Sequence, residues 1–367
     1  MIDMRKFLFV MAMSICTVLS CIKGQEDPVF PSPDLTIPIE EGVTLKGELP
    51  FPFGAAVNNN LLKNRAAYRE TVIKECNSVT AENAMKFSQL HPSENVYNWT
   101  EADYLVNFAQ QNGMRVHGHT LIWHKNPPAW VENFQGDAAA WDQLLKNHIQ
   151  TVVGRYKGKV ASWDVVNEVM SDNGGVLRNA SESIWYRKLG KEFIEKAFIY
   201  AHEADPDALL FYNDYGHEYG PTKRTAIINL INELKGKGVP IHGIGMQFHT
   251  NYKQTDANIE AAINIAAATG LKVHIAELDI SMNPKNPGIP DLVFSAGLAE
   301  QQKAKYKFIV KTYNAIPKNQ QFGITTWNVG DADSWVPGFN NLPDWPLPFD
   351  QNYQRKPAYQ GILDGVK

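Results

Sequence analysis

From about residue 50 onward, the chain alternates short apolar runs with longer segments of helical periodicity, and it does so eight times. The apolar runs, bounded by polar or turn-forming residues, span 53–57, 77–81, 114–119, 160–166, 208–212, 242–247, 272–277 and 322–327. The helical patterns between and after them span 61–76, 101–112, 138–156, 184–203, 222–235, 257–268 and 297–315, and a last one starts near 357. Strands that are apolar throughout suit a parallel sheet that is buried on both faces. Eight such units predict the α/β class and a single closed (β/α)8 TIM barrel.

An open, doubly wound sheet is the competing fold for this alternation. That fold usually carries a glycine-rich phosphate-binding loop after its first strand. No such loop follows the run 53–57. The closed barrel is therefore the better prediction.

Polar and aromatic residues follow the expected strands directly, at the end where a barrel of this kind carries its active site. In strand order they are Glu82, Asn83 and Lys86; His119 and Trp123; Asn167 and Glu168; Asn213, Asp214 and Tyr215; Gln247 and His249; Glu277; and Trp327. Chance would distribute such residues over both ends of the strands. Their convergence on one end predicts an active site there.

Glu168 and Glu277 each end an apolar run, WDVVNE and VHIAE. An ionised carboxylate at such a position is costly unless a partner or a function holds it. A structural ion pair would explain either residue alone. Strands four and seven lie across the barrel mouth from each other, so the two side chains share one site. A pair of carboxylates is what glycoside hydrolysis requires.

The pair His117 and His119 raises the alternative of a metal site. A metal-dependent hydrolase would need further ligands, and His249 and His274 are too dispersed to complete a convincing set. We therefore expect no metal, with His119 binding sugar and His117 packed or supporting it.

Three tryptophans, Trp123, Trp327 and Trp335, could simply fill the core. Their positions after the expected strands favour an aromatic wall instead, because pyranose rings present polarised C–H groups to an aromatic face. Lys86 would ordinarily be a solvated charge. Its place among polar residues after the second strand favours hydrogen bonds to sugar hydroxyls.

Residues 1–20 predict a signal peptide, since a charged start precedes an apolar run that is short for a membrane span. The residues that follow, ending at Cys21, resemble a bacterial lipoprotein box, which implies cleavage before Cys21 and lipid attachment to it. We expect an exported cell-envelope lipoprotein of the outer membrane or cell surface, held to the membrane only through this lipid. Plain secretion is the alternative.

The mature chain is expected to consist of a proline-rich tether, 21–46, and a catalytic barrel, 47–367. Cys76 is the single cysteine of the barrel, so no intramolecular disulfide is available there. The net charge of −4 provides no basic surplus for a phosphate backbone, so we expect no nucleic-acid partner. The expected oligomeric state is a monomer.

Six motifs, HGHTLIWH, WDVVNE, YNDYG, GIGMQFH, HIAELDI and FDQNYQRKPAY, together resemble glycoside hydrolase family 10, the endo-β-1,4-xylanases. The resemblance covers about residue 50 to the end of the chain. It implies a TIM barrel without a cofactor that hydrolyses β-1,4-xylosidic bonds in xylan and xylo-oligosaccharides with retention.

By motif, the resemblance implies that Glu168 is the acid/base and Glu277 the nucleophile, and that Asn167 bonds the sugar 2-hydroxyl. His249 would bond Glu277 and be oriented by Asp279, which would fix its tautomer. The residues implied to line the glycone subsites are Glu82, Asn83, Lys86, His119, Trp123 and Gln247. Those implied to close over the sugar are Trp327 and Trp335, and Tyr215 is implied on the aglycone side. As an acid, Glu168 is expected to have a raised pKa.

The segment TTWNVGDADSW departs from the family pattern, which has a glycine after the first tryptophan and a threonine two residues later. Asn328 and Gly330 occupy these positions, so the geometry around Trp335 is not carried over. Two alternatives remain open at this point: a non-catalytic xylan-binding surface lipoprotein, and a β-1,4-glucanase of the same barrel design.

Overall fold

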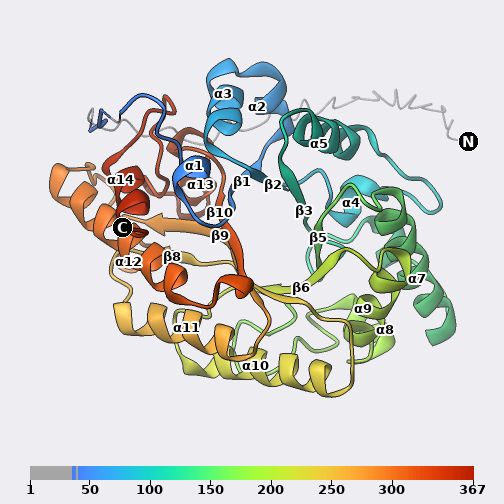
Figure 1. Cartoon of the computed structure of the whole chain (residues 1–367). Helices are drawn as coiled ribbons and strands as arrows, with labels where there is room; N and C mark the ends of the chain where they lie inside the picture. Colours follow the sequence, from blue (N-terminus) through green and yellow to red (C-terminus); the bar gives the residue numbers. More distant parts are fainter. Residues whose placement is uncertain (1–34, 39) are drawn as a thin grey trace, which may run out of the picture.

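A computed structural model describes residues 35–38 and 40–367 (Figure 1). The expected signal peptide 1–20, the lipid attachment site Cys21 and the larger part of the expected tether lie outside the described residues. Within the described part of the chain, no helix is both long and apolar enough to cross a membrane.

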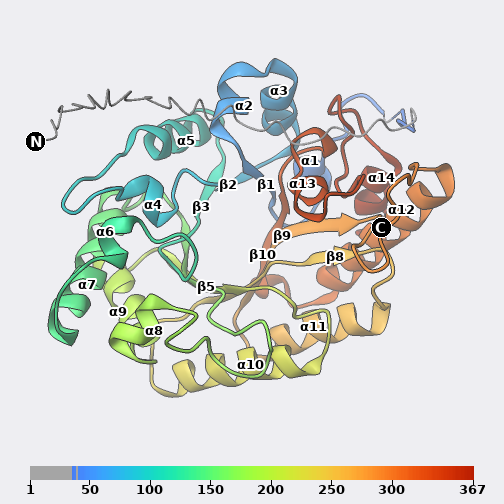
Figure 2. The same cartoon turned by 180° about the vertical axis from the view of Figure 1, so that it is seen from behind.

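Parallel strands close into a barrel, and helices surround it (Figure 1 and Figure 2). The barrel strands are β1 (Phe53–Val57), β2 (Ser78–Ala81), β3 (Arg115–Gly118), β5 (Ser162–Asn167), β6 (Leu209–Asp214), β7 (Gly243–Met246), β9 (Lys272–Ser281) and β10 (Gln321–Trp327). They pair in the order β10-β1-β2-β3-β5-β6-β7-β9, and the further pairing of β10 with β9 closes the ring. The predicted single (β/α)8 TIM barrel is confirmed.

The helices are α1 (Leu45–Glu48), α2 (Asn59–Asn64), α3 (Ala66–Glu75), α4 (Phe87–Leu90), α5 (Thr100–Gln111), α6 (Ala129–Glu132), α7 (Ala138–Arg155), α8 (Ile184–Leu189), α9 (Phe193–Ala204), α10 (Pro221–Gly236), α11 (Asp256–Ala268), α12 (Ala296–Ala315), α13 (Val336–Asn340) and α14 (Pro357–Asp364). Two predicted helices are each divided in two. Arg65 takes an extended conformation between α2 and α3, and Gly190 ends α8 with a φ of +66°. Apolar periodicity continues across both breaks, which is why the sequence pattern did not resolve them.

Aromatic side chains fill the barrel beneath the strand ends. The ring centroids of Phe211 and Phe322 are 4.5 Å apart, and those of His117 and His274 are 4.8 Å apart. All four side chains are buried. This packed layer closes the interior beneath the site, and a ring nitrogen of each of its two histidines is bound, by Ser162 and by Thr325 respectively.

Two short strands extend the sheet at that end. They are β4 (Ile122–Trp123), which pairs with β5, and β8 (His249–Asn251), which pairs with β9. Their registers set Trp123 beside Asn167 and His249 beside Asp279. The sequence predicted neither strand, because two or three residues are too few to show a periodicity.

Candidate active site

The side chains predicted for the site lie at the carboxyl ends of the barrel strands or in the loops that follow them. Direct contacts join one group into a single network, namely Trp123, Asn167, Glu168, Asn213, Gln247, His249, Glu277, Asp279 and Trp335. The remaining predicted residues contact neighbouring groups, which are described below. These residues therefore lie together at one end of the barrel.

Glu168 directly follows β5 and is only 6% exposed. Its Oε2 accepts a hydrogen bond from Nε1 of Trp123 at 2.9 Å, and its Oε1 accepts one from Nε2 of Gln247 at 3.1 Å. Its backbone is left-handed, with a φ of +57°, and its N–H donates to the carbonyl of Asn213 at 2.9 Å. Such a conformation is uncommon for a residue other than glycine and marks a position that its surroundings hold in place.

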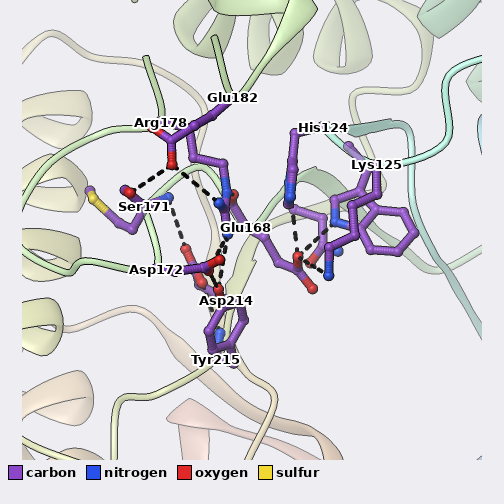
Figure 3. A network of polar contacts seen from close by, with 12 residues as sticks. His124, Lys125, Glu168, Ser171, Asp172, Arg178, Glu182, Asp214 and Tyr215 are labelled. Carbon is purple, nitrogen blue, oxygen red and sulfur yellow. Dashed lines mark hydrogen bonds and ion pairs between the residues drawn. The ribbon is translucent and has the colours of Figure 1, made fainter. Parts of the chain in front are cut away.

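Two basic residues of the loop after β4 also face Glu168 (Figure 3). Nζ of Lys125 lies 3.7 Å and Nδ1 of His124 lies 3.9 Å from its Oε2. Burial favours the neutral form of Glu168, but the charge of Lys125 and the hydrogen bonds from Trp123 and Gln247 outweigh it, so the pKa of Glu168 is lowered. The expectation of a raised pKa is wrong for the free protein, because it took no account of Lys125.

Glu277 lies within β9 and is 4% exposed. Its Oε1 accepts a hydrogen bond from Nδ2 of Asn213 at 2.7 Å. Its Oε2 lies 3.1 Å from Nε2 of His249. Each carboxylate oxygen therefore has a donor from a different strand, which fixes the plane of the carboxylate.

A chain of amides connects the two glutamates. Nδ2 of Asn213, which bonds Glu277, also donates to Oδ1 of Asn167 at 3.0 Å. Nε2 of Gln247 donates to the same oxygen of Asn167 at 3.2 Å and to Glu168 at 3.1 Å. Because these amides come from adjacent strand ends, the barrel itself sets the positions of both carboxylates.

His249 bridges two carboxylates. Its Nδ1 lies 2.7 Å from Oδ2 of Asp279, and its Nε2 faces Glu277. Burial opposes a charge on the ring, but Asp279 and Glu277 raise the pKa of His249 well above its ordinary value. The contacts that the sequence motifs implied for His249, with Glu277 and with Asp279, are both present in the structure. Nε1 of Trp335 donates to the same Oδ2 of Asp279 at 2.9 Å.

His119 and His117 share one carboxylate. Nδ1 of His119 lies 2.8 Å from Oδ2 of Asp164, and Nε2 of His117 lies 3.0 Å from Oδ1. Burial raises the pKa of Asp164, but the two histidines outweigh it and hold that pKa far below its ordinary value. Among the described residues, no group of three or more His, Cys, Asp or Glu could hold a metal ion.

Lys86 lies beside the aromatic wall. Its Nζ is 5.2 Å from the ring centre of Trp123 and 6.0 Å from that of Trp327, within range of cation–π attraction. The same nitrogen donates to Oδ1 of Asn83 at 2.9 Å. Burial lowers the pKa of Lys86, and the neighbouring glutamates oppose this effect. Glu82 accepts a hydrogen bond from Nδ2 of Asn58 at 3.2 Å.

The departure from the family pattern after β10 has a structural explanation. Asn328 is buried and has a φ of +80°, a conformation in which asparagine is the usual substitute for glycine. A Cβ on Gly330 would lie 2.9 Å from the carbonyl of Asp350, so the segment passes too close for a larger residue. Trp327 and Trp335 both still reach the site, since each ring lies near His249.

Several residues of the site were not assigned a role from the sequence. Asn213 was noted only by its position, although its place after an apolar run was a usable signal. Asp164 was missed although it is a charged residue inside a buried strand, which is itself unusual. Lys125 and Arg178 belong to loops without periodicity and gave no signal. Arg178 donates to the hydroxyl of Tyr215 at 2.9 Å (Figure 3).

A parallel barrel with two buried glutamates and an aromatic wall at its carboxyl end defines the class of barrel glycoside hydrolases. The chain belongs to glycosyl hydrolase family 10, whose family model matches residues 44–365. The resemblance seen in the sequence motifs is thereby confirmed at the level of the family.

Among its relatives, the chain is 40% identical over 321 residues to endo-1,4-beta-xylanase B of Paenibacillus barcinonensis, covering 85% of this chain and 95% of that protein. It is 39% identical over 340 residues to endo-1,4-beta-xylanase A of Cellvibrio japonicus, covering 86% of this chain and about half, 55%, of the longer relative. The structure of native xylanase 10B from Thermotoga maritima matches with a TM-score of 0.81 at 38% identity, over 88% of this chain and 98% of that one.

Proposed function

We propose that the protein is an endo-β-1,4-xylanase that hydrolyses xylan and xylo-oligosaccharides with retention, with Glu277 as nucleophile and Glu168 as acid/base. The observation that carries this proposal is the amide chain through Asn213, Asn167 and Gln247, which holds two buried carboxylates at one mouth. A protein that only binds xylan would not need such a pair. Relatives named as xylanases support the choice of substrate.

In the first step, Glu277 attacks the anomeric carbon and the glycosidic oxygen leaves with the proton of Glu168. The donors on both oxygens of Glu277, from Asn213 and His249, orient its carboxylate for the attack.

In the second step, the carboxylate of Glu168 removes a proton from water, and the resulting hydroxide displaces Glu277 from the sugar. The lowered pKa of Glu168 favours this basic form. Lys125 stabilises the ionised form of Glu168, which is the form that the second step uses and the first step cannot use.

The remaining site residues supply contacts to the sugars. Asn167, whose side-chain amide lies against those of Asn213 and Gln247, would bond a sugar 2-hydroxyl. The residues proposed for the glycone side are Glu82, Asn83, Lys86, His119, Trp123 and Gln247. Trp327 and Trp335 would cover the sugar, and Tyr215 would contact the aglycone.

Product analysis on glucuronoxylan, arabinoxylan and carboxymethylcellulose, with Glu277→Ala as the inactive control, tests this proposal. We expect xylo-oligosaccharides from both xylans, with the β-anomer formed first in proton NMR spectra, and no release by the variant. Release from carboxymethylcellulose alone would favour the β-1,4-glucanase alternative. Binding to xylan without release would favour the non-catalytic alternative.

A further inference from the structure

The loop that follows Glu168 folds back on itself as a short hairpin. The N–H of Ser171 donates to the carbonyl of Val176 at 2.9 Å, and the N–H of Arg178 donates to the carbonyl of Val169 at 2.8 Å. An isolated antiparallel bridge between Met170 and Leu177 lies between these two bonds. The hairpin thus returns Arg178 to the base of the loop, next to Glu168.

Arg178 points inward, and its side chain is only 5% exposed. Its Nε donates to the backbone carbonyl of Glu168 at 2.8 Å (Figure 3). One terminal nitrogen donates to Oδ1 of Asp172 at 2.7 Å and to the hydroxyl of Tyr215 at 2.9 Å. A buried guanidinium is tolerated only where such partners replace water, so the geometry of this group is tightly constrained.

Acidic partners balance the charge of Arg178. Its other terminal nitrogen lies 3.6 Å from Oε1 of Glu182, which also accepts a hydrogen bond from the hydroxyl of Ser171 at 2.7 Å. The hydrogen bond from Arg178 lowers the pKa of Asp172, so that this carboxylate stays ionised. The hydroxyl of Tyr215 donates to the same Oδ1 of Asp172.

The backbone of Glu168 is therefore held from both sides. Its N–H is bound by the carbonyl of Asn213, and its carbonyl is bound by Arg178. A left-handed glutamate persists only where its surroundings determine it. Trp123 and Gln247 hold the two carboxylate oxygens, and the bond from Arg178 fixes the peptide from which the side chain projects.

We propose that Arg178 is a positioning residue that couples the aglycone-side Tyr215 to the backbone of Glu168, and so aims the Glu168 carboxyl group at the leaving oxygen. This inference rests on the proposed function, in which Glu168 is the acid/base. It gives Arg178 a role through another residue, not through contact with the sugar.

A positioning role through the acid has a kinetic signature that a purely structural role lacks. A poor leaving group such as a sugar hydroxyl needs the proton of Glu168, whereas 2,4-dinitrophenolate leaves without it. Because kcat/KM reports the first irreversible step, misplacing Glu168 lowers it for xylohexaose and spares it for 2,4-dinitrophenyl β-xylobioside.

The experiment compares wild type with Arg178→Met, Arg178→Lys and the control Arg187→Met. Arg187 is an exposed arginine of α8, whose side chain reaches only the carbonyl of Ala180. For Arg178→Met we expect kcat/KM on xylohexaose to fall by up to about 100-fold, while the value on the dinitrophenyl substrate stays within about 3-fold. Arg178→Lys keeps the charge but loses the planar set of guanidinium donors. Its kcat/KM on xylohexaose should therefore fall less, and the value on the dinitrophenyl substrate should again be spared. The control should match wild type on both substrates.

Added azide gives a second readout, because it attacks the glycosyl-enzyme without help from a base. We expect azide to raise kcat of Arg178→Met on the dinitrophenyl substrate and to leave wild type unchanged. Equal losses on both substrates, in either folded variant, would overturn the inference, as would unchanged activity. Should Arg178→Met fail to fold, Arg178→Lys decides the outcome. A wild type that is inactive on both substrates would instead refute the proposed function.

Discussion

Nζ of Lys125 lies 3.7 Å from Oε2 of Glu168, and the side chain of Lys125 is about half exposed. This distance places a cation against the proposed acid/base without burying the cation. The acid that opens the reaction is thereby held at a lowered pKa by a residue that solvent can reach.

Lys125→Met should raise the pKa of Glu168, because removal of a nearby cation favours the protonated carboxyl. The acid form then persists to higher pH, so the alkaline limb of the kcat/KM profile on xylohexaose should move to higher pH. High salt should move the wild-type limb in the same direction, since it screens an exposed charge. An alkaline limb that does not move in the variant would show that Lys125 does not act on the acid.

Asn213→Ala should impair both stability and catalysis. The substitution leaves buried oxygens of Glu277 and Asn167 without their donor, which costs about 1–3 kcal/mol of unfolding free energy. The loss of orientation should lower kcat by about 100-fold. Urea titration and steady-state kinetics measure the two effects. A stable variant with wild-type kcat would show that the amide chain does not set the carboxylates.

Gly245→Ala tests the same amide from the neighbouring strand. A Cβ on Gly245 would lie 2.4 Å from Oδ1 of Asn213, so the amide must move or the strands must separate. We expect a loss of about 1–3 kcal/mol in unfolding free energy together with reduced kcat. The matched control is Gly154→Ala, on exposed helical surface where a Cβ meets nothing within 4 Å. That change should be neutral or stabilising by up to about 1 kcal/mol.

We also propose that Cys21 is lipid-modified after export. When the wild-type chain is expressed in a bacterial host, it should then incorporate labelled palmitate and sediment with the membrane fraction. Cys21→Ser should abolish the label and release active enzyme into the soluble fraction, because no membrane-spanning helix is found among residues 35–38 and 40–367. An unlabelled wild-type chain in the medium would instead support plain secretion.

The barrel could be predicted from the sequence because each strand is apolar along its length and each helix has its own period. Because active sites of such barrels lie at the carboxyl ends of the strands, Glu168 and Glu277 could then be located without any knowledge of contacts. Lys125 and Arg178 could not be found in this way, because their roles depend on loop paths that no periodicity encodes. The lowered pKa of Glu168 was missed for the same reason.

Asn213 and its neighbours show a second limit of prediction from the sequence. The sequence places Asn213, Asp214 and Tyr215 together, but the alternation of a strand sends them to different surroundings. Asn213 bonds Glu277, whereas Asp214 accepts hydrogen bonds from Tyr212 and from the backbone of Met170. Only the register of β6 against its neighbours reveals which of the three belongs to the carboxylate pair.

The most direct test of the central claim is to trap the glycosyl-enzyme with 2,4-dinitrophenyl 2-deoxy-2-fluoro-β-xylobioside and to locate the label by peptide mass spectrometry. The fluorine slows both steps, and the good leaving group lets the intermediate accumulate. We predict one fluoroxylobiosyl group per chain, attached to Glu277 and absent from Glu277→Ala. A label on Glu168, or an active enzyme that forms no covalent intermediate, would contradict the assignment of Glu277 as nucleophile.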